Sequence, residues 1–295
     1  MYQSKLTLRD IPFNGQRAFD YLETICAIGP RCTGSEGMAR QQKMLTDHFK
    51  QFDCQIERQE FTYNHPIEGT PVPGCNLIVR WEPSRPRRIL LCTHYDSLPF
   101  PLMDPKDPKG RFIGANDSGS GTALFMELGH SMTTILNQNQ TDFGVDFVFL
   151  DAEEFLFEPN GRFFVGSEFF AQQYAANTQR TWKYEQGVLL DMIADADLQI
   201  YYDRTSMSWR ESAPIARAVW KTAKELGVKE FIASPKYEVR DDHVMIRNLG
   251  GIPCVDVIDF DYPSWHTIQD VPANCSAVSL AKVGWVIQEW LKKAK

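Results

Sequence analysis

The chain has 295 residues, of which 43% are hydrophobic and 23% are charged. This balance is typical of a folded globular protein and is too apolar for a disordered one, so the chain can bury a sizeable core. The formal charge is −7, and a negative protein repels nucleic acid and anionic membranes, so we expect neither as a partner.

In chain order, the predicted elements are a helix at Gly37–Phe52, strands at Cys75–Trp81 and Arg88–Cys92, a helix at Gly119–Met132, strands at Val145–Leu150 and Val188–Asp191, a helix at Ser212–Leu226, a strand at Ile252–Ile258 and a helix at Ser279–Ala294. A proline-containing turn separates the first two strands, which we expect to be antiparallel neighbours.

Strands alternate with helices over the whole length. This pattern predicts a three-layer α/β sandwich, in which a central mixed, twisted β-sheet is flanked by helices on both faces. No repeat, low-complexity tract or linker interrupts it. We therefore expect one domain over residues 1–295, with residues 1–27 as an amino-terminal extension packed on it. The segment Leu98–Arg111, rich in Pro and Asp, is expected to be a surface loop.

The polar start Met1-Tyr2-Gln3-Ser4-Lys5 lacks the apolar region of a signal peptide, and no apolar run reaches the roughly 18–20 residues that span a membrane. We expect a cytoplasmic protein from the sequence as written, and a secreted or periplasmic one if a leader has been removed. The seven cysteines are scattered without a C-x-x-C pair. This pattern predicts buried thiols and disfavours a disulfide framework, with one or two bridges left open.

Polar side chains follow several apolar runs at the point where a strand ends, and open α/β sheets bind ligands at that edge. These positions are His94-Tyr95-Asp96, Asn116-Asp117-Ser118, Asp151-Ala152-Glu153-Glu154, Asp191 and Trp265-His266. Each one alone has an ordinary explanation, such as a helix cap, a loop turn or a core histidine. Together they collect the imidazole and carboxylate donors that zinc prefers, so the joint pattern predicts a metal site.

The adjacent acids Glu153 and Glu154 are the most informative pair. Neighbouring side chains at a strand end diverge, so one carboxylate can bind a metal while the other faces a substrate as a base. Two solvated loop acids are the alternative, and the apolar strand Val145–Leu150 directly before them argues against it. His94 and Asp96 form a weaker pattern, in which Asp96 would orient the imidazole of a metal ligand.

Several motifs follow one another along the chain: Pro30-Arg31-Cys32-Thr33-Gly34-Ser35, His94-Tyr95-Asp96-Ser97, Gly114-Ala115-Asn116-Asp117-Ser118, Glu153-Glu154, Gly166-Ser167, Leu190-Asp191, Asp241-Asp242-His243 and Trp265-His266-Thr267. In this order they resemble the zinc exopeptidase superfamily, peptidase clan MH, which includes co-catalytic zinc aminopeptidases and animal-type glutaminyl cyclases. The resemblance implies that Asp117, Glu154 and His266 bind zinc and that Glu153 is the general base and acid. It also implies a cis peptide bond between Asp117 and Ser118.

The two branches of the superfamily use the remaining residues differently. In an aminopeptidase, His94 and Asp191 would complete a second zinc site, and Asp117 would bridge the two ions. In a cyclase one zinc suffices, and Asp191 holds the α-amino group of the substrate. The nucleophile is a water molecule in the first reaction and the substrate's own amine in the second. Both act on the amino terminus of a peptide, which is the expected partner.

Several features are similar to glutaminyl cyclases. They are the short single-domain chain, the early segment from Arg31 to Gln41, the doubled acid before His243, and Trp265 immediately before His266. On this resemblance Trp265 would wall the substrate pocket. Asp241, together with Asp256, would shape the pocket and stabilise the reaction intermediate.

The sequence also departs from the animal cyclases. Asp256 stands where those enzymes carry a histidine, so Asp241 and Asp256 would face each other and share a proton. The stretch 155–164 lacks their pocket tryptophan, and Thr122 replaces a disulfide cysteine.

We therefore expect a zinc-dependent glutaminyl-peptide cyclotransferase, which converts an amino-terminal glutamine to pyroglutamate and releases ammonia. A zinc aminopeptidase is the alternative. A non-catalytic binding domain of the same fold is a third one, although the retained ligand residues argue against it.

Overall fold

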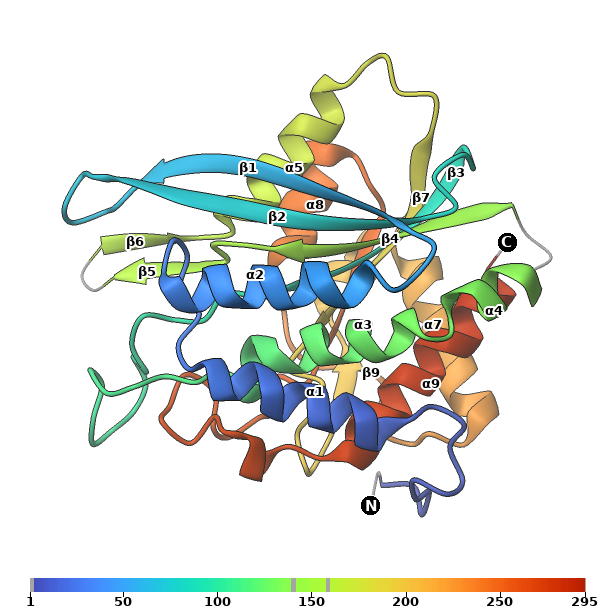
Figure 1. The fold of residues 1–295 in the computed structure, drawn as a ribbon. Coiled ribbons are helices and arrows are strands. Elements are labelled where there is room, and N and C mark those ends of the chain that lie inside the picture. Colours follow the sequence, from blue (N-terminus) through green and yellow to red (C-terminus); the bar gives the residue numbers. More distant parts are fainter. Residues whose placement is uncertain (1–2, 139–141, 158–159, 295) are drawn as a thin grey trace.

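The structure is a computed structural model that describes residues 3–138, 142–157 and 160–294 (Figure 1). At its centre is a six-stranded sheet with the order β1-β2-β4-β3-β7-β10. The strands are β1 (Gln55–Asn64), β2 (Pro71–Trp81), β3 (Arg87–His94), β4 (Phe143–Leu150), β7 (Lys183–Asp191) and β10 (Cys254–Ile258). β2 is antiparallel to both of its neighbours, while β4, β3, β7 and β10 are parallel.

Helices cover both faces of this sheet (Figure 1). On one face lie α1 (Gly15–Ile28), α2 (Glu36–Phe49), α3 (Gly121–Gly129), α4 (Met132–Gln138), α7 (Ala213–Leu226) and α9 (Ala277–Lys293). On the other face lie α5 (Val165–Ala176) and α8 (Asp242–Gly250). The predicted three-layer α/β sandwich with a mixed central sheet is confirmed.

Shorter elements complete the fold around the sheet. They are η1 (Ala115–Ser120), the hairpin of β5 (Glu154–Phe157) and β6 (Asn160–Phe163), the parallel pair of β8 (Ile200–Tyr202) and β9 (Phe231–Pro235), α6 (Arg204–Ser208) and η2 (Pro272–Asn274). The segment 98–111 contains no helix or strand and is exposed over much of its length, as expected of a surface loop.

The alternation of side chains along β3 explains why both faces need covering. Ile89 and Leu91 join the core formed with the larger helical layer, while Leu90 and Cys92 join the core under α5 and α8. Successive residues of a strand point to opposite faces, so a continuous apolar run has two faces to bury. The central strands therefore fold only between two helical layers.

The prediction that Cys75–Trp81 and Arg88–Cys92 are neighbouring strands is wrong. β4 lies between β2 and β3, antiparallel to the first and parallel to the second. The short turn before β3 has the composition of a hairpin, but the chain steps past one strand position. The strand that fills this position comes from about 50 residues later, and a local pattern cannot show that.

The helix α1 lies in the segment that we expected to be an extension. Asn14 caps it by accepting a hydrogen bond from the backbone N–H of Arg17. Its residues Ala18, Leu22 and Ile25 are fully buried in the main core. The spacing of these three residues is helical and could have been recognised from the sequence.

All seven cysteines are free thiols. Five are buried, as predicted, and Cys32 and Cys54 are partly exposed. Among the described residues, no helix is long and apolar enough to cross a membrane.

A buried charge cluster joins the central strands away from the cavity described below. Asp146 on β4 accepts hydrogen bonds from Arg88 and from Arg80, at 3.1 Å (Arg88 Nε) and 3.0 Å (Arg80 Nη1), and another from the Tyr184 hydroxyl. Arg88 and Asp146 are only 1% and 0% exposed. The carboxylate thus neutralises a guanidinium that has no access to solvent.

We expect Asp146→Ala to lower the free energy of unfolding by about 3–5 kcal/mol, because Arg88 would keep a buried charge without its partner. Urea unfolding followed by circular dichroism measures this change. Glu57→Ala is the control, since Glu57 pairs with Arg80 at the surface and should cost at most about 1 kcal/mol. Equal losses in the two variants would contradict this account.

Candidate metal centre and active site

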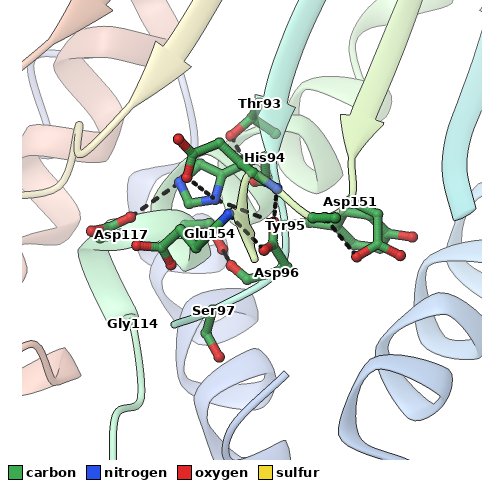
Figure 2. A network of polar contacts seen from close by, with 12 residues as sticks. Thr93, His94, Tyr95, Asp96, Ser97, Gly114, Asp117, Asp151 and Glu154 are labelled. Carbon is green, nitrogen blue, oxygen red and sulfur yellow. Dashed lines mark hydrogen bonds and ion pairs between the residues drawn. The ribbon is translucent and has the colours of Figure 1, made fainter. Parts of the chain in front are cut away.

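Side chains from distant parts of the chain converge at the carboxyl edge of the parallel strands (Figure 2). His94 ends β3, Asp191 ends β7, and Glu154 begins β5 after a short turn that follows β4. Asp117 belongs to η1, and His266 lies in the loop that follows β10. All five are buried.

Asp117, Glu154 and His266 form a compact set of ligand atoms. His266 Nε2 lies 3.0 Å from Glu154 Oε1 and 3.4 Å from Asp117 Oδ2. Both oxygens are buried and make no hydrogen bond within the described part of the chain, although they lie close to the imidazole. These three ligand atoms lie close together without hydrogen-bonding geometry, so they face a common point between them. One imidazole nitrogen and two carboxylate oxygens there fit a zinc ion.

A second set of atoms shares Asp117 with the first. His94 Nε2 lies 3.0 Å from Asp117 Oδ1 and 3.2 Å from Asp191 Oδ1. One ligand atom of each of these three residues lies within 4.8 Å of the others. Asp117 therefore stands between His94 and His266, and its peptide bond with Ser118 is cis, which confirms that expectation. Both ligand sets named from the sequence are brought together.

The pKa values of these groups reflect burial among like charges. Burial raises the pKa of Glu154 to about 8, and the charge of Asp117 contributes to that shift. Burial alone would lower the pKa of His266, but Asp117 and Glu154 outweigh it and raise the value to about 10. Burial raises the pKa of Glu153 well above its usual range. Carboxylates that hold protons or pair with an imidazolium at neutral pH indicate a site that takes a cation.

Asp96 holds the backbone of the acid pair. Its Oδ1 accepts a hydrogen bond from the N–H of Glu153 at 3.1 Å. Its Oδ2 accepts one from the N–H of Glu154 at 2.9 Å (Figure 2). Its approach to His94 Nδ1 is longer, at 3.6 Å. The sequence predicted that Asp96 orients the imidazole of His94. The shortest contacts of Asp96 are instead with the turn that carries the two glutamates.

The backbone around Asp117 is held by two buried residues. Asp270 accepts hydrogen bonds from the N–H groups of Asn116 at 2.8 Å and Asp117 at 3.1 Å. Arg31 is fully buried and donates to the carbonyl oxygen of Gly114 at 2.8 Å. Arg31 stands in a motif quoted above, whereas Asp270 was missed, because nothing in its local sequence points to partners more than 150 residues away.

Among the residues that the structure describes, four other than glycine adopt left-handed backbone conformations at this edge of the sheet. They are Ala152, Phe164, Met192 and His266, with φ angles of 57°, 67°, 46° and 56°. Such conformations cost on the order of 1–3 kcal/mol each and persist where the surrounding structure fixes them. They lie next to Glu153 and Asp191 or carry a ligand themselves. The surrounding structure therefore holds a strained backbone at these positions, and this backbone sets the directions of the side chains at the site.

A cavity of about 620 Å³ opens over the converging side chains. Acidic residues, among them Glu153, Asp191 and Asp241, form part of its lining. Trp265 also lines it, with its ring centroid 4.2 Å from that of His266. The remaining wall and rim residues include Gly161, Arg162, Phe163, Phe164, Glu168, Met192, Val239, Arg240, Met245, Ile258 and Phe260. Residues 158 and 159 of the stretch 155–164 lie outside the described residues.

Asp241 lines the cavity, but Asp256 is not among the described residues that do. Asp256 is buried on β10, and its N–H donates to Ser206 Oγ at 3.1 Å. His243 lies beside it, with Nδ1 3.9 Å from Asp256 Oδ2 and Nε2 3.2 Å from Asp203 Oδ2. Burial raises the pKa of Asp256 well above its usual range, and the charge of Asp241 adds to the shift. The tertiary structure thus supplies an imidazole that position 256 lacks.

We expect Asp270→Asn to weaken binding of a divalent cation at this site by about 10- to 100-fold, since the ligand-bearing backbone would lose one of its two acceptors. Isothermal titration with zinc measures the affinity. Asp10→Asn is the matched control, because Asp10 accepts a backbone N–H from Thr7 in an exposed turn. An unchanged affinity in Asp270→Asn would show that Asp270 does not hold Asp117.

Comparison with known proteins agrees with this geometry. The chain is 26% identical over 264 residues to the glutaminyl-peptide cyclotransferase-like protein of Bos taurus, an alignment that covers 83% of this chain and 67% of the bovine one. The structure of Fimbriiglobus ruber glutaminyl cyclase is 33% identical, with a TM-score of 0.91 over 100% of this chain and 99% of that one. A leucine aminopeptidase precursor from Bacteroides thetaiotaomicron is 26% identical, with a TM-score of 0.86 over 96% and 98% of the two chains.

The resemblance stated from the motifs is thereby confirmed. Residues 76–291 match the model of peptidase family M28, which amounts to well over half of the chain. The protein therefore belongs to peptidase family M28, as a glutaminyl cyclase-like member of that family.

Proposed function

We propose that this protein is a glutaminyl-peptide cyclotransferase. The observation that carries the proposal is the buried carboxylate of Glu153 in the lining of a cavity that also contains Trp265 and the ligand set Asp117, Glu154 and His266. The similarity of the whole chain to a bacterial glutaminyl cyclase supports the same function. The substrate is a peptide that enters with its amino-terminal glutamine.

A single zinc ion held by Asp117, Glu154 and His266 is part of this proposal. In that set two buried oxygens have no hydrogen-bond partner among the described residues, whereas the Oδ1 atoms of Asp117 and Asp191 both contact His94 Nε2. When bound, zinc supplies a Lewis acid that polarises the side-chain amide carbonyl of the substrate and positive charge that favours ionised carboxylates.

Glu153 is the proposed general base and acid. The α-amine of the substrate attacks its own side-chain carbonyl carbon, a C–N bond forms, and the bond to the side-chain nitrogen breaks. Glu153 takes a proton from the attacking amine and delivers it to the departing ammonia. Its position in the cavity lining, on a turn held by Asp96, keeps the carboxylate in one place for both transfers.

Two further acids complete the proposed mechanism. Asp191 lines the cavity and orients the α-amino group of the substrate. Asp241 also lines it, and burial, followed by the charges of Asp191 and Asp242, raises the pKa of Asp241 well above its usual range. A carboxylic acid whose pKa is raised in this way keeps its proton to higher pH, and when protonated it can donate a hydrogen bond to the reaction intermediate. Asp256 lies behind the lining, and neither of its carboxylate oxygens makes a hydrogen bond with a described residue, so the proton that we expected it to share with Asp241 is not part of the proposal.

In this proposal, residues 1–295 form one domain. Residues of α1, within the segment 1–27 that we expected to be an extension, contribute to the same core as the central strands. The expected partner is therefore a peptide bound by this single unit through its amino terminus.

A zinc aminopeptidase is the second candidate. It is favoured by the close approach of His94, Asp117 and Asp191, which could hold a second ion, and by the similarity to a leucine aminopeptidase precursor. Such an enzyme would use Glu153 to deprotonate a water molecule and would release a free amino acid.

The reaction product distinguishes the two candidates. We expect ammonia from Gln-Ala and no free amino acid from Leu-Ala, measured by a coupled ammonia assay and by amino-acid analysis. Glu153→Gln should lower the turnover of Gln-Ala by at least about 100-fold while zinc remains bound, because the proton carrier is lost and the ligands are kept.

Glu225→Gln is the matched control, since Glu225 is a partly exposed residue of α7. It should keep the wild-type turnover. Free amino acid from Leu-Ala without ammonia from Gln-Ala would replace the cyclase with the aminopeptidase. Full activity of Glu153→Gln would refute the role of Glu153.

We expect about one zinc per chain after dialysis, measured by elemental analysis. His266→Ala should lose this zinc, because it removes the single nitrogen ligand of the proposed set. His130→Ala is the control, since His130 is an exposed residue that contacts Tyr21. Two equivalents of zinc in the wild-type protein would show that His94 and Asp191 bind a second ion.

A further inference from the structure

We propose that Arg240 selects peptides that carry an acidic side chain directly after the amino-terminal glutamine. The inference rests on the proposed cyclase function and adds a preference for the chemistry of the second residue. It follows from the size of the cavity, from the charges in its lining and from the way in which Arg240 is held.

The cavity is larger than one glutamine side chain requires. Its volume of about 620 Å³ lies in the range of pockets that enclose drug-sized ligands. The reacting groups of the substrate must reach Glu153 and Asp191. The residue after the glutamine therefore remains within the cavity, beside lining residues that take no part in the chemistry.

Two arginines belong to the described lining, and their guanidinium groups have different surroundings. Arg162 is paired with the carboxylate of Glu168 and donates to the Tyr63 hydroxyl at 2.9 Å. Arg240 is exposed, and no carboxylate of the described residues lies within 4.0 Å of its guanidinium nitrogens. Its guanidinium carbon lies 5.7 Å from the centroid of the Phe164 ring. The charge of Arg240 is thus available to a ligand.

The backbone at Arg240 is anchored on both sides. The N–H of Val239 donates to Asp203 Oδ1 at 2.9 Å, and its carbonyl accepts from Thr205 Oγ1 at 2.8 Å. On the other side, Asp241 caps α8 and lines the cavity. Arg240 therefore projects from a fixed point next to a residue that faces the reaction. A guanidinium placed in this way suits a carboxylate, which it can bind through two parallel hydrogen bonds.

A partly solvated ion pair of this kind changes kcat/KM by about two- to five-fold. The effect should fall on KM more than on kcat, because the contact lies away from the bonds that change and stabilises ground state and transition state alike. It should also weaken as salt is added, since exposed charges are screened.

Three tripeptide amides test the inference: Gln-Glu-Ala, Gln-Gln-Ala and Gln-Lys-Ala. Amidation removes the terminal carboxylate, so a preference for the first peptide reports the acidic side chain alone. Ammonia release at low ionic strength should follow the order Glu, Gln, Lys at the second position. Arg240→Ala should level the three values of kcat/KM, and Arg240→Glu should invert the order.

Arg217→Ala is the matched control, because Arg217 is exposed on α7 and outside the cavity lining. Like Arg240→Ala, this variant removes one positive charge, and it should keep the wild-type order of kcat/KM for the three peptides. An Arg240→Glu variant that turns over Gln-Gln-Ala but retains the wild-type order would overturn this inference alone. Wild-type protein that releases no ammonia from any of the three peptides would overturn the proposed function itself.

Discussion

The burial of many carboxylates at one edge of the sheet is the constraint on which the rest of the site depends. A buried acid must be protonated, accept hydrogen bonds or face a cation. Asp96 and Asp270 meet this requirement with backbone N–H groups, and in doing so they hold the turn of the glutamates and the backbone of Asp117. Glu154 directs one oxygen to the N–H of Leu98 and leaves the other beside His266. The structural acids thus position the ones that are available to a metal.

The same ligand residues serve two chemistries in this superfamily, so the choice between them depends on what surrounds the ligands. A cyclase must enclose an amine and an amide of one residue, which favours a cavity with an aromatic wall such as Trp265. The buried group of Asp241, Asp256 and His243 differs from that of the animal cyclases at position 256. His243 of α8 lies beside Asp256, so an imidazole is present in this group although position 256 has a carboxylate where animal cyclases have a histidine.

Local sequence patterns located the central strands well and their arrangement poorly. The runs at 145–150 and 188–191 end where β4 and β7 end, because an apolar run stops where the chain leaves the core. The order of strands depends on pairing between segments far apart, so the position of β4 between β2 and β3 could not be read from either one. α5 was missed although its buried residues Phe170 and Tyr174 stand at helical spacing, and the short α8 was missed as well.

The sequence by itself determined the chemical character of the site. Acids and imidazoles at the ends of apolar runs can only gather at one sheet edge, and the motifs that contain Asp117, Glu153, Glu154 and His266 stated which family to expect. Only the tertiary structure decided how these groups are supported and what encloses them. Three features show this: the contacts of Asp270, the imidazole of His243 near Asp256, and the place of Arg240 in the cavity lining. Each depends on residues that are remote in sequence or lie on different elements. A hydrogen bond or a cavity wall depends on distance in space, and only packing of the whole chain sets that distance.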